Sequence, residues 1–314
     1  MNKAAVALTR CTDYYADKIS VCLQRQFELL GGLAKFVKPG DTVLIKPNFI
    51  APKSASHATQ THPAVIIELA KLLLDFKAKP FVGDSPAWQN VYACVKKLKL
   101  DEPLKKLGVP VKQLDEPVTC LIGDNNLKIK ISKAALDADV IINLPKFKSH
   151  QQLVATFAVK NMFGCVPGKR KALWHFRKGT HEFDFCKMLL DIYGYLKPAL
   201  TIIDGVVAMD GPGPINGRAK PLGWLIGSTD PIACEIVCSK LINSEPDNFP
   251  VIRTATKMGL GFELDEIQIL GDDYKEHICT DFEPAPLTLI KFSLSRVCKS
   301  AAKQLLILLK LHKP

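Results

Sequence analysis

The sequence predicts an α/β fold, a mostly parallel β-sheet with crossover helices on both faces. Three observations support this prediction. Short apolar runs alternate along the chain with longer amphipathic patterns, as is typical of parallel strands joined by helices. Runs such as ADVIINLP at 138–145 are apolar throughout, which indicates strands that are buried on both faces. The chain has 314 residues, 47% of them hydrophobic, which is enough for one large core. We therefore expect a Rossmann-like three-layer sandwich.

The individual elements follow from the spacing of the apolar residues. Residues 63–76 are expected to form a helix, because apolar side chains recur on one face at the helical period. The other expected helices are 88–99, 182–196, 231–242 and 249–258. The expected strands, in chain order, are 4–8, 41–47, 79–84, 138–145, 199–205, 221–228 and 266–272. Residues 164–180 contain three glycines and a proline and are expected to be a mobile loop.

The chain is expected to contain one α/β domain, residues 1–290, followed by a basic amphipathic helix, residues 291–314. A subdomain boundary near 110–135 is considered, although the composition marks it weakly. In the last segment leucines and a valine share one side of the helix, and lysines lie elsewhere. Such a helix can lie on an anionic membrane surface or on a partner. Docking on its own domain is the favoured interpretation, because apolar stripes usually face a core.

The positive charge is concentrated in two segments. The net charge is +11, and residues 160–178 and 284–314 each carry six Lys or Arg and no acid. The rest of the chain is therefore nearly neutral. Proteins that bind nucleic acid usually spread positive charge along a footprint that follows the phosphates. Nucleic acid is thus a less favoured partner, and a basic segment beside a small anionic ligand explains the pattern equally well.

The ten cysteines are scattered and form no CxxC pair. A chain of this length does not need disulfides for stability, so we interpret them as reduced thiols in a cytoplasmic protein. No run of 18 apolar residues predicts a membrane-spanning helix. The N-terminal residues lack the pattern of a secretory signal.

Polar residues are expected at the carboxyl ends of the strands, where α/β proteins bind ligands. Three motifs share a polar residue directly before a proline and ahead of a helical pattern: TQTHP (59–63), VGDSP (82–86) and GSTDP (227–231). Helix N-termini present free N–H groups, so three such helix starts can surround one anion site. The alternative for each motif is an ordinary helix cap. We include His62, Asp84 and Ser85 among the candidate site residues.

Lysines follow two of the predicted strands. Lys46 and Asn48 end the strand 41–47 and are expected to bind a phosphate or carboxylate. In NLPKFKSH (143–150), Lys146, Lys148 and His150 alternate, so in an extended segment they project to one face. Neighbouring positive charges lower the pKa of a histidine or lysine and prepare it for proton transfer. The alternative is a basic edge strand whose lysines discourage aggregation.

Further candidates come from two later motifs. KNMFG (160–164) adds Lys160 and Asn161, and TIIDGVVAMDGPGP (201–214) adds Asp204 and Asp210. Paired carboxylates can bind a divalent metal or act as acid and base. With lysines nearby they can instead form ion pairs, and the sequence leaves this choice open. No P-loop, GxGxxG or zinc spacing occurs, so the sequence identifies no cofactor.

In their order and spacing the motifs IKPN, THP, GDSP, NLPKFKSH, KNMFG, IIDG and DGPGP resemble the family called domain of unknown function 362 (DUF362). The resemblance covers residues 42–262, most of the chain. Many relatives carry a ferredoxin-like module with two CxxCxxCxxxC runs for [4Fe–4S] clusters, which implies redox chemistry. This sequence has no such run, so by resemblance a separate ferredoxin would supply electrons. The resemblance places these residues in family motifs: Lys46, Asn48, His62, Asp84, Lys146, His150, Lys160 and Asn161.

Three hypotheses follow. The first is an enzyme acting on a small anionic molecule, with His150, Lys146 and Asp84 in catalytic roles and the other candidates binding substrate or cofactor. Its reaction type, redox or proton transfer among others, is left open. The second is a nucleic-acid or membrane-surface binder that uses residues 160–178 and 291–314. The third is a non-catalytic accessory protein of an iron–sulfur system.

Overall fold

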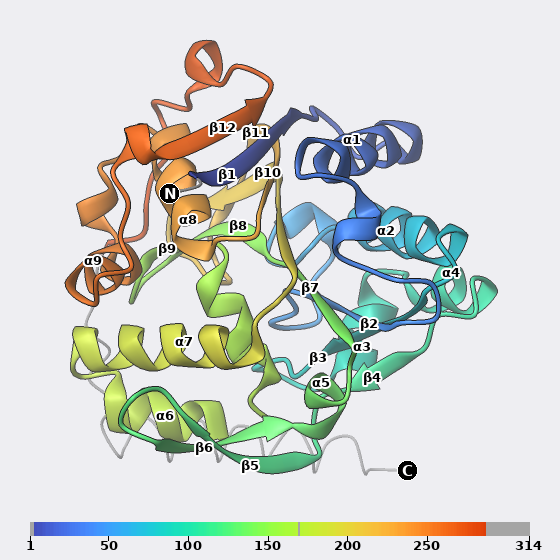
Figure 1. Cartoon of the computed structure of the whole chain (residues 1–314), viewed down its shortest axis with the longest axis horizontal. Coiled ribbons are helices and arrows are strands. Elements are labelled where there is room, and N and C mark those ends of the chain that lie inside the picture. Colours follow the sequence, from blue (N-terminus) through green and yellow to red (C-terminus); the bar gives the residue numbers. More distant parts are fainter. Residues whose placement is uncertain (1–2, 169, 287–314) are drawn as a thin grey trace.

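The computed structural model describes residues 3–168 and 170–286, which fold around a ten-stranded sheet (Figure 1). The expected C-terminal helix 291–314 lies outside the described residues. The strand order is β12-β1-β11-β10-β7-β2-β3-β4, and β8 pairs with β10 and with β9. The α/β class and the mostly parallel sheet with helices on both faces are therefore confirmed. In the described part of the chain no helix combines the length and apolar character that crossing a bilayer requires.

Seven of the described strands, β1, β2, β3, β7, β10, β11 and β12, match the predicted apolar runs. The bounds of all the described strands are β1 Ala4–Arg10, β2 Thr42–Pro47, β3 Lys79–Asp84, β4 Val111–Gln113, β5 Pro117–Ile122, β6 Leu127–Ser132, β7 Val140–Leu144, β8 Lys146–His150, β9 Val154–Thr156, β10 Leu200–Asp210, β11 Arg218–Ser228 and β12 Ile267–Gly271. Strands β10 and β11 are longer than expected, because they continue as an antiparallel pair that reaches Asp210 and Arg218, and β10 also pairs with β8 there.

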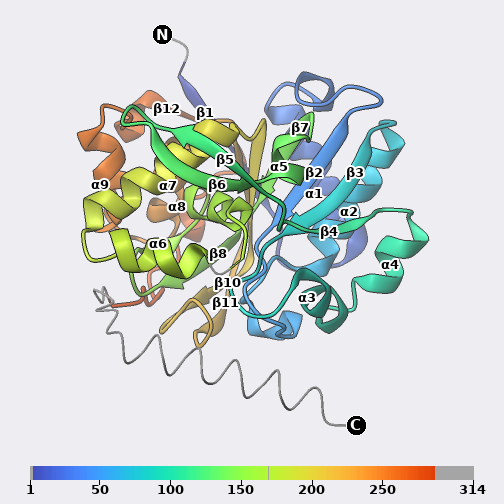
Figure 2. The same ribbon diagram turned by 90° about the horizontal axis from the view of Figure 1, so that it is seen from below.

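The helices form one layer on each face of the sheet (Figure 2). Their bounds are α1 Ala16–Leu29, α2 Pro63–Asp75, α3 Val91–Lys97, α4 Asp101–Lys106, α5 Lys133–Leu136, α6 Arg170–Lys178, α7 Glu182–Leu196, α8 Pro231–Leu241 and α9 Pro250–Lys257. Residues of α1–α4 share one hydrophobic core with one side of the strands. Residues of α5–α9 share a second core with the other side. Successive residues of β2 alternate between the two cores, Val43 and Ile45 in the first and Leu44 in the second, as the period of a strand requires.

Several elements were not expected from the sequence: helices α1, α4 and α5 and strands β4, β5, β6 and β9. Helix α1 buries Ile19, Leu23 and Phe27 but also Gln26, and this polar residue interrupts the apolar stripe. The hairpin of β5 and β6 is a separate two-stranded sheet in the region of the considered boundary. The expectation of a mobile loop over 164–180 was wrong, because residues 170–178 form helix α6. Its buried Trp174 supplies an apolar anchor that outweighs the flanking glycines.

The reversed direction of strand β11 decides where ligand groups can meet. Strand β11 is antiparallel to both of its neighbours, β1 and β10, whereas β1, β2, β3, β7, β8 and β10 all point the same way. We call the edge at which these parallel strands end the carboxyl rim. Asp230, which follows β11, therefore lies at the opposite edge and caps α8 through Ile232 and Ala233. The expectation that GSTDP shares an anion site with THP and GDSP was wrong for this reason.

Candidate functional site

A buried ion pair stands at the carboxyl rim between two neighbouring strands. Lys46 ends β2 and Asp84 ends β3, and Lys46 Nζ lies 3.0 Å from Asp84 Oδ1. Lys46 also donates to the carbonyl of Pro47, and Asp84 accepts from the backbone N–H groups of Phe49 and Ser85. Neither side chain is more than 2% exposed. The charges of two predicted site residues are thus already balanced by each other.

Gly164 closes over this ion pair from the 3₁₀ segment Val159–Cys165. A Cβ atom on Gly164 would overlap Asp84 Oδ1 and Lys46 Nζ, so only glycine allows the segment to approach so closely. The carbonyl of Gly164 accepts the N–H of Ser85 at 3.2 Å. The tight contact fixes the segment that carries Lys160 and Asn161 against the strand ends.

A second buried pair joins β8 to β10. Lys146 Nζ donates to Asp204 Oδ2 and to the hydroxyl of Tyr14, both at 2.8 Å. The Tyr14 hydroxyl donates to Asp204 Oδ1 at 2.7 Å and accepts the N–H of Val207. The backbone N–H of His62 donates to Asp204, and the His62 ring stacks on Tyr14 at 3.5 Å between centroids. This cluster is also balanced in charge, and the tyrosine hydroxyl has used its one proton and both lone pairs.

A chain of amides links the two halves of the rim. Asn161 Nδ2 donates to the carbonyl of Lys46 and to Asn143 Oδ1. Asn48 Nδ2 donates to Asn161 Oδ1 at 2.9 Å, and Lys148 Nζ donates to Asn48 Oδ1. Residues from IKPN, NLPKFKSH and KNMFG, far apart in the sequence, therefore meet in one hydrogen-bonded network.

Five basic side chains lie close together on this rim, and we call them the basic cluster: Lys148, His150, Lys160, Lys171 and His175. The charge of Lys160 lowers the pKa of each of the other four, so all of them lie within its electrostatic reach. None of the three lysines forms an ion pair with any described residue. Lys148 donates only to Asn48 Oδ1 and the carbonyl of Thr59, and Lys171 only to the carbonyls of Ser85 and Val166. Lys160 has no hydrogen-bond or ion-pair partner among residues 3–168 and 170–286.

Burial makes positive charge costly throughout the basic cluster. It lowers the pKa of Lys160 to about 8 and that of Lys171 to about 8. Burial, followed by the charge of Lys160, holds the pKa of Lys148 and of His150 well below their ordinary values. Burial lowers the pKa of His175 to about 3. With pKa values of about 8, Lys160 and Lys171 remain cations near neutral pH, and neither has a described counter-ion. Such an arrangement is costly, and an added anion would relieve it.

The hydrogen bond to His150 restricts what this ring can do. His150 Nδ1 accepts the backbone N–H of Gln152 at 3.1 Å, so this nitrogen carries a lone pair. The proton of the neutral ring is then on Nε2. His150 therefore offers a hydrogen-bond donor toward a ligand. The catalytic role expected for His150 stays a prediction, and the hydrogen bond limits the neutral ring to donating from Nε2.

Several buried polar atoms in residues connected to the basic cluster, by a hydrogen bond or through the sequence, have no hydrogen-bond partner among the described residues. They are Thr59 Oγ1, Gln60 Oε1, Ser149 Oγ and Gln152 Oε1. Each belongs to a residue that is at most 7% exposed. Thr59 contributes its carbonyl to Lys148, and the other polar residues adjoin Thr59 or His150 in the sequence. Unsatisfied buried polar atoms usually mark a missing water or ligand.

Ser85 connects the rim to helix α6. Its Oγ accepts the N–H of Gly168 at 2.9 Å, and its carbonyl accepts Lys171 Nζ at 2.6 Å. Helix α3 begins later, and its cap is Asn90, so Ser85 is not the helix cap that GDSP suggested. The inner side of α6 holds Lys171, Trp174 and His175 toward the site, and the helix covers the basic cluster.

Two predictions about the acidic residues have different outcomes. Asp84 and Asp204 form ion pairs, one of the two alternatives that the sequence left open. Asp210 contacts neither ion pair. Its carboxylate accepts hydrogen bonds from Arg218 and from the backbone N–H of Glu283 instead. Within the described residues no group of three His, Cys, Asp or Glu side chains is arranged to hold a metal.

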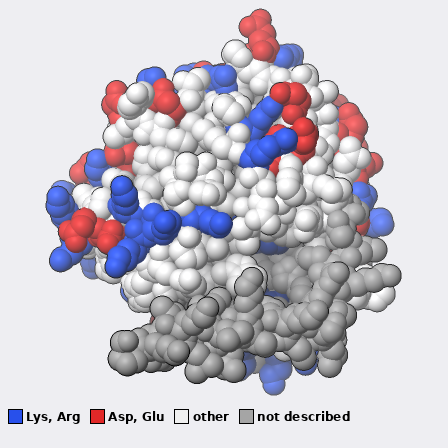
Figure 3. All heavy atoms as spheres, turned by 180° about the vertical axis from the view of Figure 1, so that it is seen from behind, with Lys and Arg blue, Asp and Glu red and all other residues white. Residues whose placement is uncertain are grey.

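The basic segment 160–178 does not form an open surface stripe in its described part. Lys160 and Lys171 are half-buried, and Lys178 lies 3.4 Å from Asp184. On the face seen in Figure 3, described Lys and Arg side chains stand in small groups, most of them next to Asp or Glu.

Three site residues were not named as candidates from the sequence. Tyr14 follows β1, and its place at the rim depends on β1 being parallel to β10, which the sequence does not reveal. Lys171 and His175 lie in the segment that we expected to be a loop. An i, i+3, i+4 pattern of Lys171, Trp174 and His175 would have indicated one face of a helix.

The chain is similar to a known protein family and to a known protein of Synechocystis sp.. The family model described as "Domain of unknown function (DUF362)" matches residues 43–240. A thylakoid-associated protein of Synechocystis sp. is 35% identical over 304 residues, which are 96% of this chain and 95% of that protein.

Two solved structures show limited similarity. The lactate racemase apoprotein from Thermoanaerobacterium thermosaccharolyticum has a TM-score of 0.44 at 15% identity over 76% of this chain. A protein from Thermotoga maritima has a TM-score of 0.43 at 14% identity over 70% of this chain. The matched region spans 57% of the length of each of these structures.

Proposed function

This chain belongs to the DUF362 family. From the site at its strand ends, we propose that it is an enzyme that binds a small anion, either a carboxylate or a phosphate. The enzyme would transfer a proton to or from this anion. The observation that carries the proposal is the basic cluster, in which no lysine has a carboxylate partner among the described residues. The two other buried lysines of the rim, Lys46 and Lys146, are each balanced by an aspartate. A bound anion would supply the missing negative charge.

The residues have distinct roles in this proposal. Lys160 and Lys171 bind the anion, and His150 donates a hydrogen bond from Nε2. Lys148 is the candidate acid–base group, because its burial and neighbours lower its pKa and a neutral amine can accept a proton. Lys146 and Asp84, expected to be catalytic, instead hold Tyr14, Asp204 and Lys46 in place. A redox reaction with a separate ferredoxin stays an alternative prediction.

Thermal unfolding with added anions tests this proposal. Phosphate and small carboxylates such as lactate are compared with chloride at equal ionic strength. We expect phosphate or a carboxylate to raise the melting temperature by several degrees, because a ligand at a hundred times its Kd stabilises by about 2.7 kcal/mol. Lys160→Met should remove the shift, whereas Lys187→Met, which removes a lysine paired with Asp191, should keep it. If no anion shifts the wild-type protein, the proposal is wrong.

A second candidate function is contact with an anionic membrane surface. The relative at 35% identity is named for its association with thylakoids. Helix α6 has an outer face with Leu173 44% exposed and Phe176 43% exposed, and Arg170 and Arg177 flank this face. Exposed apolar residues next to arginine are typical of helices that lie in a lipid interface.

Vesicle sedimentation tests the second candidate. Neutral phosphatidylcholine vesicles are compared with vesicles that contain phosphatidylglycerol. We expect binding only to the anionic vesicles, and we expect Leu173→Ser with Phe176→Ser to weaken it. The control is Val21→Ser on α1, where Val21 is 62% exposed. Deletion of 291–314 measures the share of the basic tail, and binding that depends on neither segment would contradict the candidate.

A further inference from the structure

We propose that the anion bound at the basic cluster is a 2-oxo acid and that Lys148 Nζ attacks its carbonyl carbon to form an imine. This inference rests on the proposed function, because the basic cluster must first hold the carboxylate, and it replaces the acid–base role of Lys148 with that of a nucleophile. It names the class of substrate and a covalent step that binding alone does not require.

The hydrogen bonds of Lys148 distinguish it from the other buried lysines of the rim. Lys46 and Lys146 each contact an aspartate, as ammonium groups do. Lys148 contacts two neutral acceptors, Asn48 Oδ1 at 2.5 Å and the carbonyl of Thr59 at 3.0 Å. A neutral amine has two N–H groups and one lone pair, so these two acceptors use both hydrogens. The lone pair is then left for attack on an electrophile.

The amide network fixes Asn48 in the orientation that Lys148 needs. Asn161 donates its Nδ2 hydrogens to Lys46 and Asn143, so Asn161 Oδ1 is an acceptor toward Asn48. Asn48 must then present Nδ2 to Asn161 and Oδ1 to Lys148. Asn48 is therefore a positioning residue that holds the amine with its hydrogens directed away from the substrate side.

The groups around Lys148 suit the carboxylate of such a substrate. Lys160 is a half-buried cation with no described partner, and it connects the cluster to solvent. His150 Nε2 supplies a donor, and within residues 3–168 and 170–286 the buried hydroxyl of Thr59 has no hydrogen-bond partner. An anionic group bound by Lys160 would place an adjacent carbonyl carbon beside Lys148, which is 3% exposed. The burial and positive neighbours that lower the pKa of Lys148 also favour its reactive neutral form.

The covalent step is balanced without an additional reactant. The lone pair of Nζ forms a bond to the carbonyl carbon, and the carbonyl oxygen takes up one of the amine protons to give a carbinolamine. A second proton transfer from nitrogen to this oxygen breaks the C–O bond and releases water. The product is a C=N bond between Lys148 and the substrate, and water reverses the reaction. No oxidation or reduction occurs.

Borohydride trapping tests the inference on the full chain. The protein is incubated with glyoxylate, pyruvate or 2-oxoglutarate, reduced with sodium borohydride, digested and mapped by mass spectrometry. We expect close to one equivalent of a secondary amine adduct at Lys148 with at least one of these acids. Acetone, which has a carbonyl but no carboxylate, should give no adduct there. Adducts spread over exposed lysines, or an equal yield with acetone, would overturn the inference.

Variants and a binding control separate this inference from the proposed function. Lys148→Arg should abolish the adduct. Lys160→Met should lower the adduct yield at a low concentration of the 2-oxo acid, and the yield should return to the wild-type level at a high concentration. The location of the adduct in the wild-type protein tests the inference even if a variant fails to fold. Lactate, which has no carbonyl, is measured in parallel by thermal unfolding. If lactate and pyruvate stabilise the protein but no adduct forms, the imine is wrong and anion binding remains. If neither lactate nor pyruvate stabilises the protein and no adduct forms, both the imine and the proposed anion binding are wrong.

Discussion

At the scale of single residues, the rim contains lysines in two energetic situations. Lys46 and Lys146 are desolvated, but each has an aspartate within 3.0 Å. Lys148, Lys160 and Lys171 are desolvated to different degrees without a described carboxylate. Removing one member of a buried pair leaves an uncompensated charge, whereas removing an unpaired cation relieves repulsion. Substitutions should therefore separate structural from ligand-binding lysines.

Lys46→Met should lower the free energy of unfolding by about 3–5 kcal/mol, because it leaves Asp84 buried without its partner. Urea unfolding measures this change. The control is the double variant Lys46→Met with Asp84→Leu, which should recover most of the lost stability because neither charge remains. A loss below about 1 kcal/mol in the single variant would show that the pair does not compensate Asp84.

Gly164→Ala should destabilise the protein by about 1–3 kcal/mol, the usual cost of inserting a methyl group into a packed region. The added Cβ would overlap the Lys46–Asp84 pair. Gly194→Ala on α7 is the matched control, because a Cβ there meets nothing within 4 Å. That change should raise stability by about 0.5–1 kcal/mol, the helix preference of alanine over glycine. Equal effects of the two substitutions in urea unfolding would contradict the close contact.

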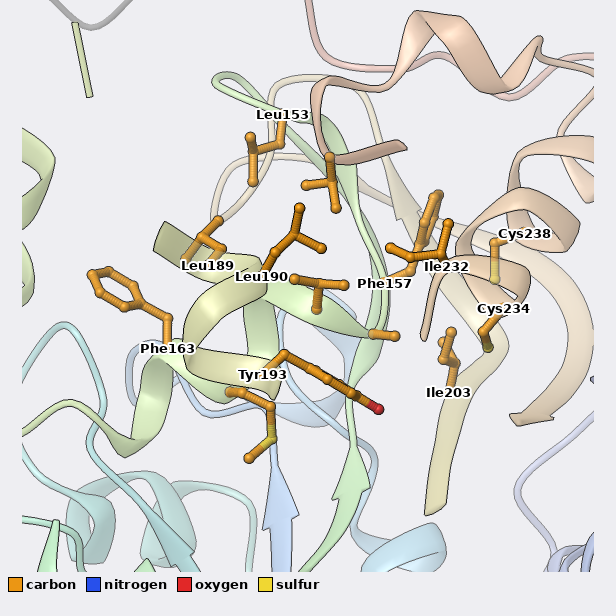
Figure 4. Packing of buried hydrophobic residues seen from close by; sticks show 14 of the residues in the cluster. Leu153, Phe157, Phe163, Leu189, Leu190, Tyr193, Ile203, Ile232, Cys234 and Cys238 are labelled. Carbon is orange, nitrogen blue, oxygen red and sulfur yellow. The ribbon is translucent and has the colours of Figure 1, made fainter. Parts of the chain in front are cut away.

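At the scale of elements, the segment Val159–Cys165 is positioned from both sides. Phe163 of this segment and Leu189, Leu190 and Tyr193 of α7 belong to one packed cluster (Figure 4). On its other side, Glu235 of α8 accepts the N–H of Val159 at 2.9 Å. Cys234 and Cys238, on the same helix, are buried thiols in the same cluster. The segment that carries Lys160 thus depends on two helices for its position.

Glu235 should make stability fall as the pH rises. Burial raises the pKa of Glu235 from 4.5 to about 7, so the folded protein favours the protonated carboxyl group. The stability that this protonated group contributes is fully present below about pH 4.5 and is lost as the pH rises to about 7. The loss is roughly 3 kcal/mol at about 1.4 kcal/mol for each pKa unit. Glu235→Gln should remove this dependence. Urea unfolding between pH 4 and pH 8 measures it, and parallel curves for the two proteins would contradict the prediction.

Seven strands and the polar residues that follow them could be predicted from the sequence, whereas helices α1, α4, α5 and α6 could not. Apolar runs such as 138–145 identify buried strands, and the polar residues that follow them identify the rim. Helix α6 was missed because Gly168 and Gly179 bracket it, and α1 because Gln26 interrupts its stripe. Gln26 is buried because its amide donates to the carbonyls of Ala7 and Leu225, and such long-range partners are not visible in a sequence.

At the scale of the whole molecule, strand direction brings the distant motifs together. The sequence shows that Lys46, Asp84, Lys146 and Asp204 follow apolar runs, but not that they contact one another in pairs. It also does not show that β11 is reversed, which removes Asp230 from the rim. The set of rim residues was therefore largely predictable, whereas the partner of each residue required the fold.

Anion affinity should fall as the pH rises above about 8. Lys160 and Lys171 each have a pKa of about 8 in the free protein, and a bound anion stabilises their charged forms and raises these pKa values. Binding near pH 8 should therefore take up protons. Titration calorimetry with phosphate in buffers of different ionisation enthalpy measures the uptake. Lys160→Met should reduce it, and an uptake of zero between pH 7.5 and 9 would contradict the assignment.

The direction of β1 has a practical consequence for experiments at a surface. Since β1 ends at the carboxyl rim beside Tyr14, it begins at the opposite edge of the sheet. A linker attached ahead of Ala4 would leave the molecule on the side away from Lys160. Sensor chips or beads that capture the protein through such a linker would therefore leave the ligand-facing edge open to the flowing solution.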